Sequence, residues 1–171
     1  VVTVTELRIR EWAEARQRTL GVVASNPDIR QGLEALNVGA TEGDEIRDSL
    51  SECLRPLLTS DAAFVGVTVL DGKGQAVSTI GTSPEGARLR TILGSVGDQS
   101  SISRFVTLDR SATVGGVVFR SIESEEGGRI GRLVGWLSLD EIGYLLTSVG
   151  SLGEGSRLYV VDASGSALPA E

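Results

Sequence analysis

Apolar residues in the first third of the chain recur at helical spacing. Over Val1–Val23 they return every three to five positions, with charged side chains between them, which predicts a long amphipathic helix. Asn26 supplies a capping side chain directly before a proline, so a short second helix is predicted at Pro27–Leu36. Thr41 or Gly43 precedes a third stretch of helical periodicity. The pattern therefore predicts three consecutive helices before any strand.

From residue 63 the apolar positions follow the shorter period of strands. Phe64–Leu70 and Gln75–Ile80 flank a Gly-Lys-Gly turn and are predicted to form a hairpin. Asp71 is expected to accept hydrogen bonds from the backbone of that turn. A helical stretch, three strands and a last helix capped by Asp140 follow, at residues 84–96, 103–109, 113–122, 129–139 and 141–149. This order predicts an α+β fold in which the long N-terminal helix packs on a PAS-like five-stranded antiparallel sheet.

The strand and turn pattern of this hairpin occurs a second time near the C-terminus. It lies at Arg157–Leu168, where Asp162 takes the place that Asp71 has in the first copy. The sequence ends before this hairpin is followed by a domain, begins with Val and contains no Met, so we expect a piece of a longer protein. We divide the chain into a helical segment at 1–60, a PAS-like module at 61–150, and a linker with the first strands of a truncated second module at 151–171.

Composition and charge narrow the choice of partners. The chain has 16 basic and 23 acidic residues, a net charge of −7, and 40% hydrophobic residues, enough for a substantial core. The negative balance and the lack of basic clusters interleaved with aromatic residues argue against nucleic-acid binding. No apolar run reaches 18 residues, so membrane contact is expected only through flanking segments outside this chain.

The residue types available for catalysis and metal binding are few. The chain has no histidine and a single cysteine, Cys53, which excludes Ser-His-Asp and Cys-His nucleophilic sites and leaves few ligands for a transition metal. Cys53 lies at an apolar position of a helical pattern and is interpreted as a small buried side chain. The acidic run Glu123, Glu125 and Glu126 fits a solvated turn. We therefore expect no catalytic residue, metal or cofactor.

Four residues near the predicted strands are candidates for contact with a ligand. An arginine that points into an apolar pocket would suit a carboxylate, and an aromatic ring would stack on a ligand. The alternatives are that each arginine lies on the surface and that the tryptophan packs against a helix. By alternation along its strand, the tryptophan shares a face with Arg132. The candidates are Arg104, Phe105, Arg120 and Trp136.

Four stretches together resemble the Cache family of extracytoplasmic sensor domains, in its double-Cache form. The first is VVASNPDIRQGLEAL at Val22–Leu36, and the second is the hairpin FVGVTVLDGKGQAVST at Phe64–Thr79. In the third, Gly131–Leu146, a strand runs directly into a helix with acidic residues at its start. The fourth, Ser156–Leu168, resembles the opening of a membrane-proximal second module. The resemblance covers most of the chain.

The resemblance implies a role in sensing. Such domains lie outside the cytoplasmic membrane in histidine kinases, chemoreceptors or diguanylate cyclases, and they bind small molecules over the sheet. The first helix of the family often mediates dimer contacts, which implies a homodimer through the N-terminal helix here. The expected partner is thus a small-molecule ligand whose binding shifts the population of two arrangements of the long helix.

One departure from the family and two other functions stay open. Between Ile80 and Val118 the only aromatic residue is Phe105. The Trp-Tyr pair and the Tyr-x-Asp motif of amino-acid-binding members are therefore absent. The first alternative function is a dimerisation or protein-interaction module that binds no ligand. The second is a cytosolic regulatory domain of the PAS or GAF type.

Overall fold

The computed structural model describes residues 2–84, 89–92, 105–107, 114–147, 160–161 and 167–168. Three helices come first: α1 (Val2–Ala24), α2 (Pro27–Asn37) and α3 (Gly43–Ser60). The later elements are β1 (Phe64–Asp71), β2 (Ala76–Gly81), β3 (Phe105–Thr107), β4 (Val114–Glu123), β5 (Arg129–Ser138), α5 (Asp140–Thr147), β6 (Val160–Val161) and β7 (Ala167–Leu168). Residues 89–92, between β2 and β3, are helical. The predicted bounds of α1, α2, β1 and β2 are each correct to within one residue.

Five of the strands in the described ranges form one antiparallel sheet in the order β2-β1-β5-β4-β3. Four strands are long, and β3 is a three-residue strand at one edge. The first hairpin lies at the other edge, and β5 joins the two halves by pairing with both β1 and β4. The predicted α+β fold with a long N-terminal helix and a PAS-like antiparallel sheet is confirmed. Strands β6 and β7 pair separately at the second hairpin signature, and Asp162 lies outside the described residues.

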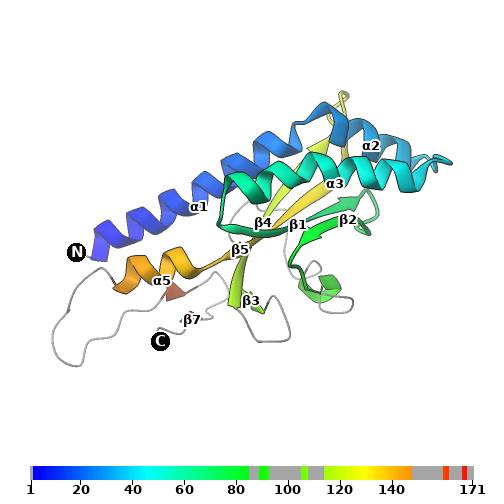
Figure 1. Ribbon diagram of the computed structural model, residues 1–171. Coiled ribbons are helices and arrows are strands. Elements are labelled where there is room, and N and C mark those ends of the chain that lie inside the picture. The colour runs from blue at the N-terminus through cyan, green and yellow to red at the C-terminus, as the bar shows by residue number, and fades with distance from the viewer. Residues whose placement is uncertain are drawn as a thin grey trace.

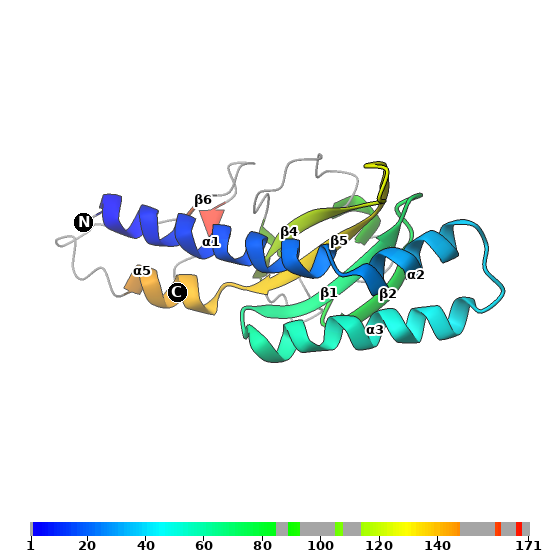
Figure 2. The ribbon, with the colours of Figure 1, turned by 90° about the horizontal axis from the view of Figure 1, so that it is seen from above.

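Helices α1, α2 and α3 cover one face of the sheet, which we call the helix face (Figure 1; Figure 2). The helical segment and the sheet share one hydrophobic core, because each contributes side chains at the spacing its secondary structure requires. The helices contribute Trp12, Leu20, Ile29, Leu33, Leu50, Leu54 and Leu57, and the strands contribute Phe64, Val67, Val69, Val118, Ile122, Leu133 and Leu137.

Local signals explain where the helices begin. Asn26 Oδ1 accepts a hydrogen bond of 2.9 Å from the backbone N–H of Asp28, and Pro27 occupies the first turn of α2, as predicted. The prediction that Asp140 caps the last helix is wrong in detail. Asp140 lies inside the first turn of α5, and its N–H donates to Ser138 Oγ at 3.1 Å. No helix in the described ranges combines the length and the hydropathy needed to span a bilayer.

The turn of the first hairpin is built by Asp71, as the sequence predicts. Its Oδ1 accepts hydrogen bonds from the backbone N–H groups of Lys73, at 2.9 Å, and Gln75, at 2.8 Å. Gly74 has a φ of 78°, a left-handed conformation that favours glycine. The carboxylate of Asp71 therefore already has hydrogen-bond partners within the turn.

Helix α5 follows directly on β5 and returns to lie beside α1 (Figure 2). Glu141 of α5 accepts hydrogen bonds from Trp12 Nε1 at 2.6 Å and from Arg16 Nη2 at 2.9 Å. The same Arg16 nitrogen lies 3.4 Å from Asp61 Oδ1, and the guanidinium lies 4.8 Å from the centre of the Trp12 ring. We call Trp12, Arg16, Asp61 and Glu141 the α1–α5 cluster.

Candidate ligand-binding site

The second face of the sheet, which we call the distal face, carries an apolar floor of its own. Its side chains alternate with those of the helix face along each strand. Of the described residues outside the sheet, Leu89 and Ile92 pack against this floor. The buried apolar residues of the distal face are Leu70, Val117, Phe119, Val134 and Trp136. The three helices do not cover this side of the sheet, yet its five apolar side chains are at most 4% exposed.

Trp136 lies in the middle of the distal face and is fully buried. Its Nε1 donates a hydrogen bond of 3.0 Å to Thr68 Oγ1, and Thr68 is also fully buried. Thr79 Oγ1 lies 3.2 Å from the same Thr68 oxygen and donates to it. Because a buried indole N–H needs an acceptor, Thr68 fixes the orientation of the ring. Trp136 therefore forms part of the floor.

Arg120 lies on the other side of the sheet. It is paired across β4 and β5 with Leu133, which belongs to the core under the helices, and directly opposite residues share a face. A Cβ atom added to Gly21 would lie 3.4 Å from Arg120 Nε, so the side chain extends over α1. Arg120 and Trp136 are consequently on opposite faces, and the structure does not bring them together.

The structure says less about the other two predicted contacts. Arg104 is outside the described residues. Phe105 opens β3 and pairs with Gly116 of β4, which places its backbone at the edge of the sheet. Their assignment as ligand contacts stays a prediction.

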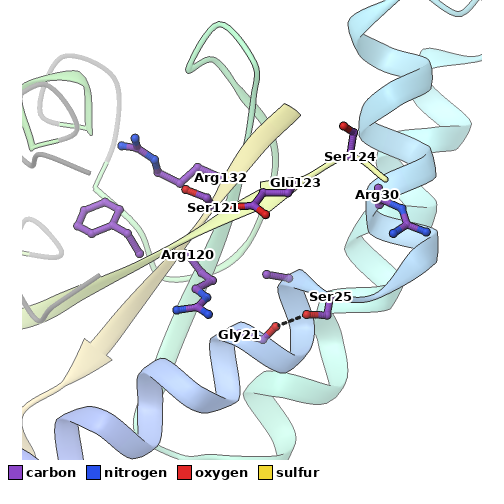
Figure 3. Close-up of a pocket in the computed structure, with 10 residues that line it drawn as sticks. Gly21, Ser25, Arg30, Arg120, Ser121, Glu123, Ser124 and Arg132 are labelled. Carbon is purple, nitrogen blue, oxygen red and sulfur yellow. Dashed lines mark hydrogen bonds between the residues drawn. The ribbon is translucent and has the colours of Figure 1, made fainter. Parts of the chain in front are cut away.

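A hollow of about 550 Å³ lies between the end of α1 and the outer part of β4. Figure 3 shows that Arg120 points toward α1 while Arg132 points to the opposite side of the strands. Glu123 and Arg30 also line this hollow, and Arg30 forms an ion pair of 2.9 Å with Glu125. The described lining thus holds three arginines, Arg30, Arg120 and Arg132, and one glutamate, and Arg30 is already paired with a carboxylate.

A second hollow, of about 360 Å³, has a more one-sided charge. It lies where the turn between β1 and β2 meets the start of β5, and we call it the basic hollow. Among the described residues that line it, four side chains are cationic, and one, Asp71, is acidic. The cationic residues are Lys73, Arg90, Arg129 and Arg132.

The backbone on two sides of the basic hollow is held by the last residue of α2. Asn37 Nδ2 donates a hydrogen bond of 2.8 Å to the carbonyl of Ile130, at the start of β5. Asn37 Oδ1 accepts one of 3.2 Å from the N–H of Gly72, in the turn between β1 and β2. One side chain from the helix face therefore positions two of the three segments that carry cations into the hollow.

The basic hollow was missed at the level of sequence. In the sequence, Lys73 fits a hairpin turn, and Arg90 belongs to a separate segment. The one available signal was the alternation that puts Arg132 on the same face as Trp136, which the structure confirms. The other cations could not be assigned to one site from the sequence, because they lie on segments that are far apart along the chain.

The single thiol is not part of this site. Cys53 is partly buried on α3 and packs against the core of the helix face. Burial raises the pKa of the Cys53 thiol, and the nearby carboxylates of Asp28 and Glu52 raise it further. The thiol is therefore a poor nucleophile, as its apolar position predicted. Among the described residues, no three His, Cys, Asp or Glu side chains are placed to hold a metal ion.

Comparison with family profiles and with curated protein sequences gives no match. Solved structures do match. One is the ligand-binding domain of the Pseudomonas fluorescens chemoreceptor CtaA in complex with L-isoleucine, with a TM-score of 0.59 and 16% identity, over 97% of this chain and 63% of that one. The same receptor's domain in complex with L-leucine matches with a TM-score of 0.53 and 18% identity, over 97% of this chain and 70% of that one.

The chain has the fold of these ligand-binding domains. They are sensor domains of the Cache type, so the fold that the sequence resemblance implied is confirmed. The Escherichia coli DcuS sensor domain also matches, with a TM-score of 0.47 and 21% identity, over 84% of this chain and 98% of that one. The chain spans less than two thirds of the CtaA domain that is bound to L-isoleucine.

Proposed function

We propose that this chain is the ligand-binding part of a membrane receptor and that it senses a small molecule over its distal face. The observation that carries the proposal is the hollow at one end of the distal face, where Leu70 lies among charged side chains. Three helices cover one face, and the other carries an apolar floor that ends in the basic hollow. Small-molecule sites are typically apolar surfaces with a few placed polar groups. The likeness in fold to chemoreceptor ligand-binding domains supports the same function.

Each predicted contact has a different place in this proposal. Trp136 is fully buried and, with its ring fixed by Thr68, supports the sheet beneath the ligand without contacting it. Arg104 and Phe105 remain predicted contacts of the ligand. Arg120 points toward α1, on the helix face, so it would not contact a ligand on the distal face. No catalytic group is assigned, so the chain acts by binding alone.

The proposed output is a change in the helices that leave the sheet. Residues 61–150 form the sensing module, residues 1–60 carry the helices, and residues 151–171 lead into a second module. The α1–α5 cluster supports this route, because Glu141 joins the helix after β5 to the long first helix. A receptor with histidine kinase, methyl-accepting or cyclase output, and an extracytoplasmic position for this chain, follow from the resemblance.

A second candidate is a dimerisation module that needs no ligand. It is favoured by two apolar side chains on α1, Leu7 and Val22, which are 53% and 75% exposed. A homodimer through α1 is also compatible with ligand sensing. Ligand binding therefore separates the two functions, and dimerisation alone does not.

The experiment is a thermal-shift screen of the whole chain against small molecules of anionic, neutral and cationic types. A sensor domain gains stability by mass action when its ligand binds, and the bound ligand is then located by crystallography. A ligand on the distal face supports the proposal. A screen with no stabilising compound, together with an α1-mediated dimer, supports the second candidate.

A further inference from the structure

We propose that the ligand of this domain is a small organic anion and that the basic hollow binds its carboxylate or phosphate group. This inference rests on the proposed sensing function and names the chemical class of the ligand. It is based on the meeting of four cationic side chains at one place in a chain of negative net charge.

Charge is the first argument. The chain has a net charge of −7, yet the described lining of the basic hollow has four cationic side chains and one acidic side chain. The acidic one, Asp71, already accepts hydrogen bonds from the N–H groups of Lys73 and Gln75. Guanidinium and ammonium groups are the side chains that bind carboxylate and phosphate most strongly. The hollow therefore favours an anion.

The state of two of these cations is the second argument. Neither Lys73 nor Arg90 forms an ion pair with any residue that the structure describes. Both side chains are exposed, so an incoming anion would not displace an existing partner. By contrast, Arg47 and Arg55 on α3 are also exposed, and each pairs with a carboxylate of its own helix.

Continuity with the apolar floor is the third argument. Leu70 belongs to the distal face and also lines the basic hollow. Leu89 packs on the same floor, and Arg90 follows it in the sequence. A molecule whose charged end lies among the cations of the hollow would thus also contact Leu70 with its apolar part. An organic anion uses both surfaces, whereas an inorganic ion uses one.

The test is a calorimetric titration of the whole chain with hexanoate, glutarate and inorganic phosphate. Hexanamide and glutaramide serve as neutral controls of the same shape. The double variant Lys73→Gln/Arg90→Gln removes the two unpaired cations, and the double variant Arg47→Gln/Arg55→Gln removes the same charge from α3. Circular dichroism melting verifies that both variants fold.

We expect at least one of the two carboxylates to bind and its amide to bind at least about tenfold more weakly, as for the loss of a charge-assisted contact. The Lys73→Gln/Arg90→Gln variant should weaken binding by about tenfold or more, and the α3 variant should leave the affinity unchanged. Tighter binding of phosphate than of the carboxylates would identify a phosphorylated ligand, and the opposite order a carboxylic acid.

Three outcomes would overturn the inference: no anion binds, the amides bind as tightly as the acids, or the α3 variant loses as much affinity as the hollow variant. A neutral or cationic compound found on the distal face in the screen would leave the sensing function in place and refute only the anionic class. Absence of any ligand, of whatever charge, would instead refute the sensing function.

Discussion

At the scale of single residues, the hydrogen bond from Trp136 to Thr68 is the most sensitive point of the distal face. Replacing Thr68 by valine keeps the shape but leaves the buried indole N–H without its acceptor. The expected loss of unfolding free energy is about 1–3 kcal/mol. Urea denaturation measures it. Thr79→Val is the matched control, because Thr79 is exposed and its hydroxyl only donates to Thr68, so its loss should be smaller. Equal losses would show that Thr68 has no special role.

Gly135 is a second position at which the surrounding packing determines the residue type. An added Cβ would lie 2.6 Å from Phe64 Cε1 and 2.9 Å from Val118 Cγ1, closer than packed carbon atoms allow. Gly135→Ala should therefore reduce the unfolding free energy by about 1–3 kcal/mol. Gly143, within α5, has nothing within 4 Å of an added Cβ. Gly143→Ala should stabilise the protein by up to about 1 kcal/mol. The reverse order in thermal melting would contradict this packing.

The thiol of Cys53 offers a prediction that depends on pH. Burial and nearby carboxylates raise the pKa of this thiol. At pH 8 a smaller fraction of it is therefore thiolate than of an unperturbed cysteine. Alkylation by iodoacetamide at pH 8 should be slower in the folded chain than in urea, and the folded rate should rise as the pH rises. Equal rates at pH 8 would mean that the thiol is not shielded.

At the scale of elements, the α1–α5 cluster joins the first helix to the helix that follows the last long strand. Glu141 accepts from both Trp12 and Arg16, so Glu141→Ala should cost about 1 kcal/mol, a value kept small because this side chain is half exposed. A double-mutant cycle of Glu141→Ala with Trp12→Phe should give a coupling energy of about 0.5–1 kcal/mol. Additive effects would show that the two helices are not coupled through this carboxylate.

Local signals in the sequence predict most of the helices and strands. They do not predict the contacts between these elements. Asn26 and Asp71 act within a few residues of themselves, so the short helix and the hairpin turn were predicted to within one residue. Alternation gave the facing of Trp136 within β5. It did not give the register of β4 against β5, which pairs Trp136 with Val117 and puts Arg120 on the other face.

The basic hollow lay beyond prediction for the same reason. Lys73 and Arg90 each have a local explanation as an exposed polar residue. Only the folded sheet brings the hairpin turn, the segment after β2 and the start of β5 to one place. Asn37 adds a contact from α2 to two of these segments, and no sequence pattern links a helix end to two distant turns.

At the scale of the whole molecule, the two faces of the sheet have different tasks. The helix face holds the fold together through one continuous core. The distal face carries the smaller apolar floor and the cationic side chains at its end. A ligand on the distal face would contact β1 and β5, and β5 leads directly into α5 and from there to α1. The proposed signal therefore passes through the sheet to the long helix.

The most direct test of this account is chemical-shift mapping by heteronuclear NMR during titration with a ligand found in the screen. The account predicts that the largest amide shifts fall on Leu70–Gly74 and Val134–Trp136, with smaller shifts reaching α5. Shifts confined to the outer surfaces of α1, α2 and α3 would contradict it.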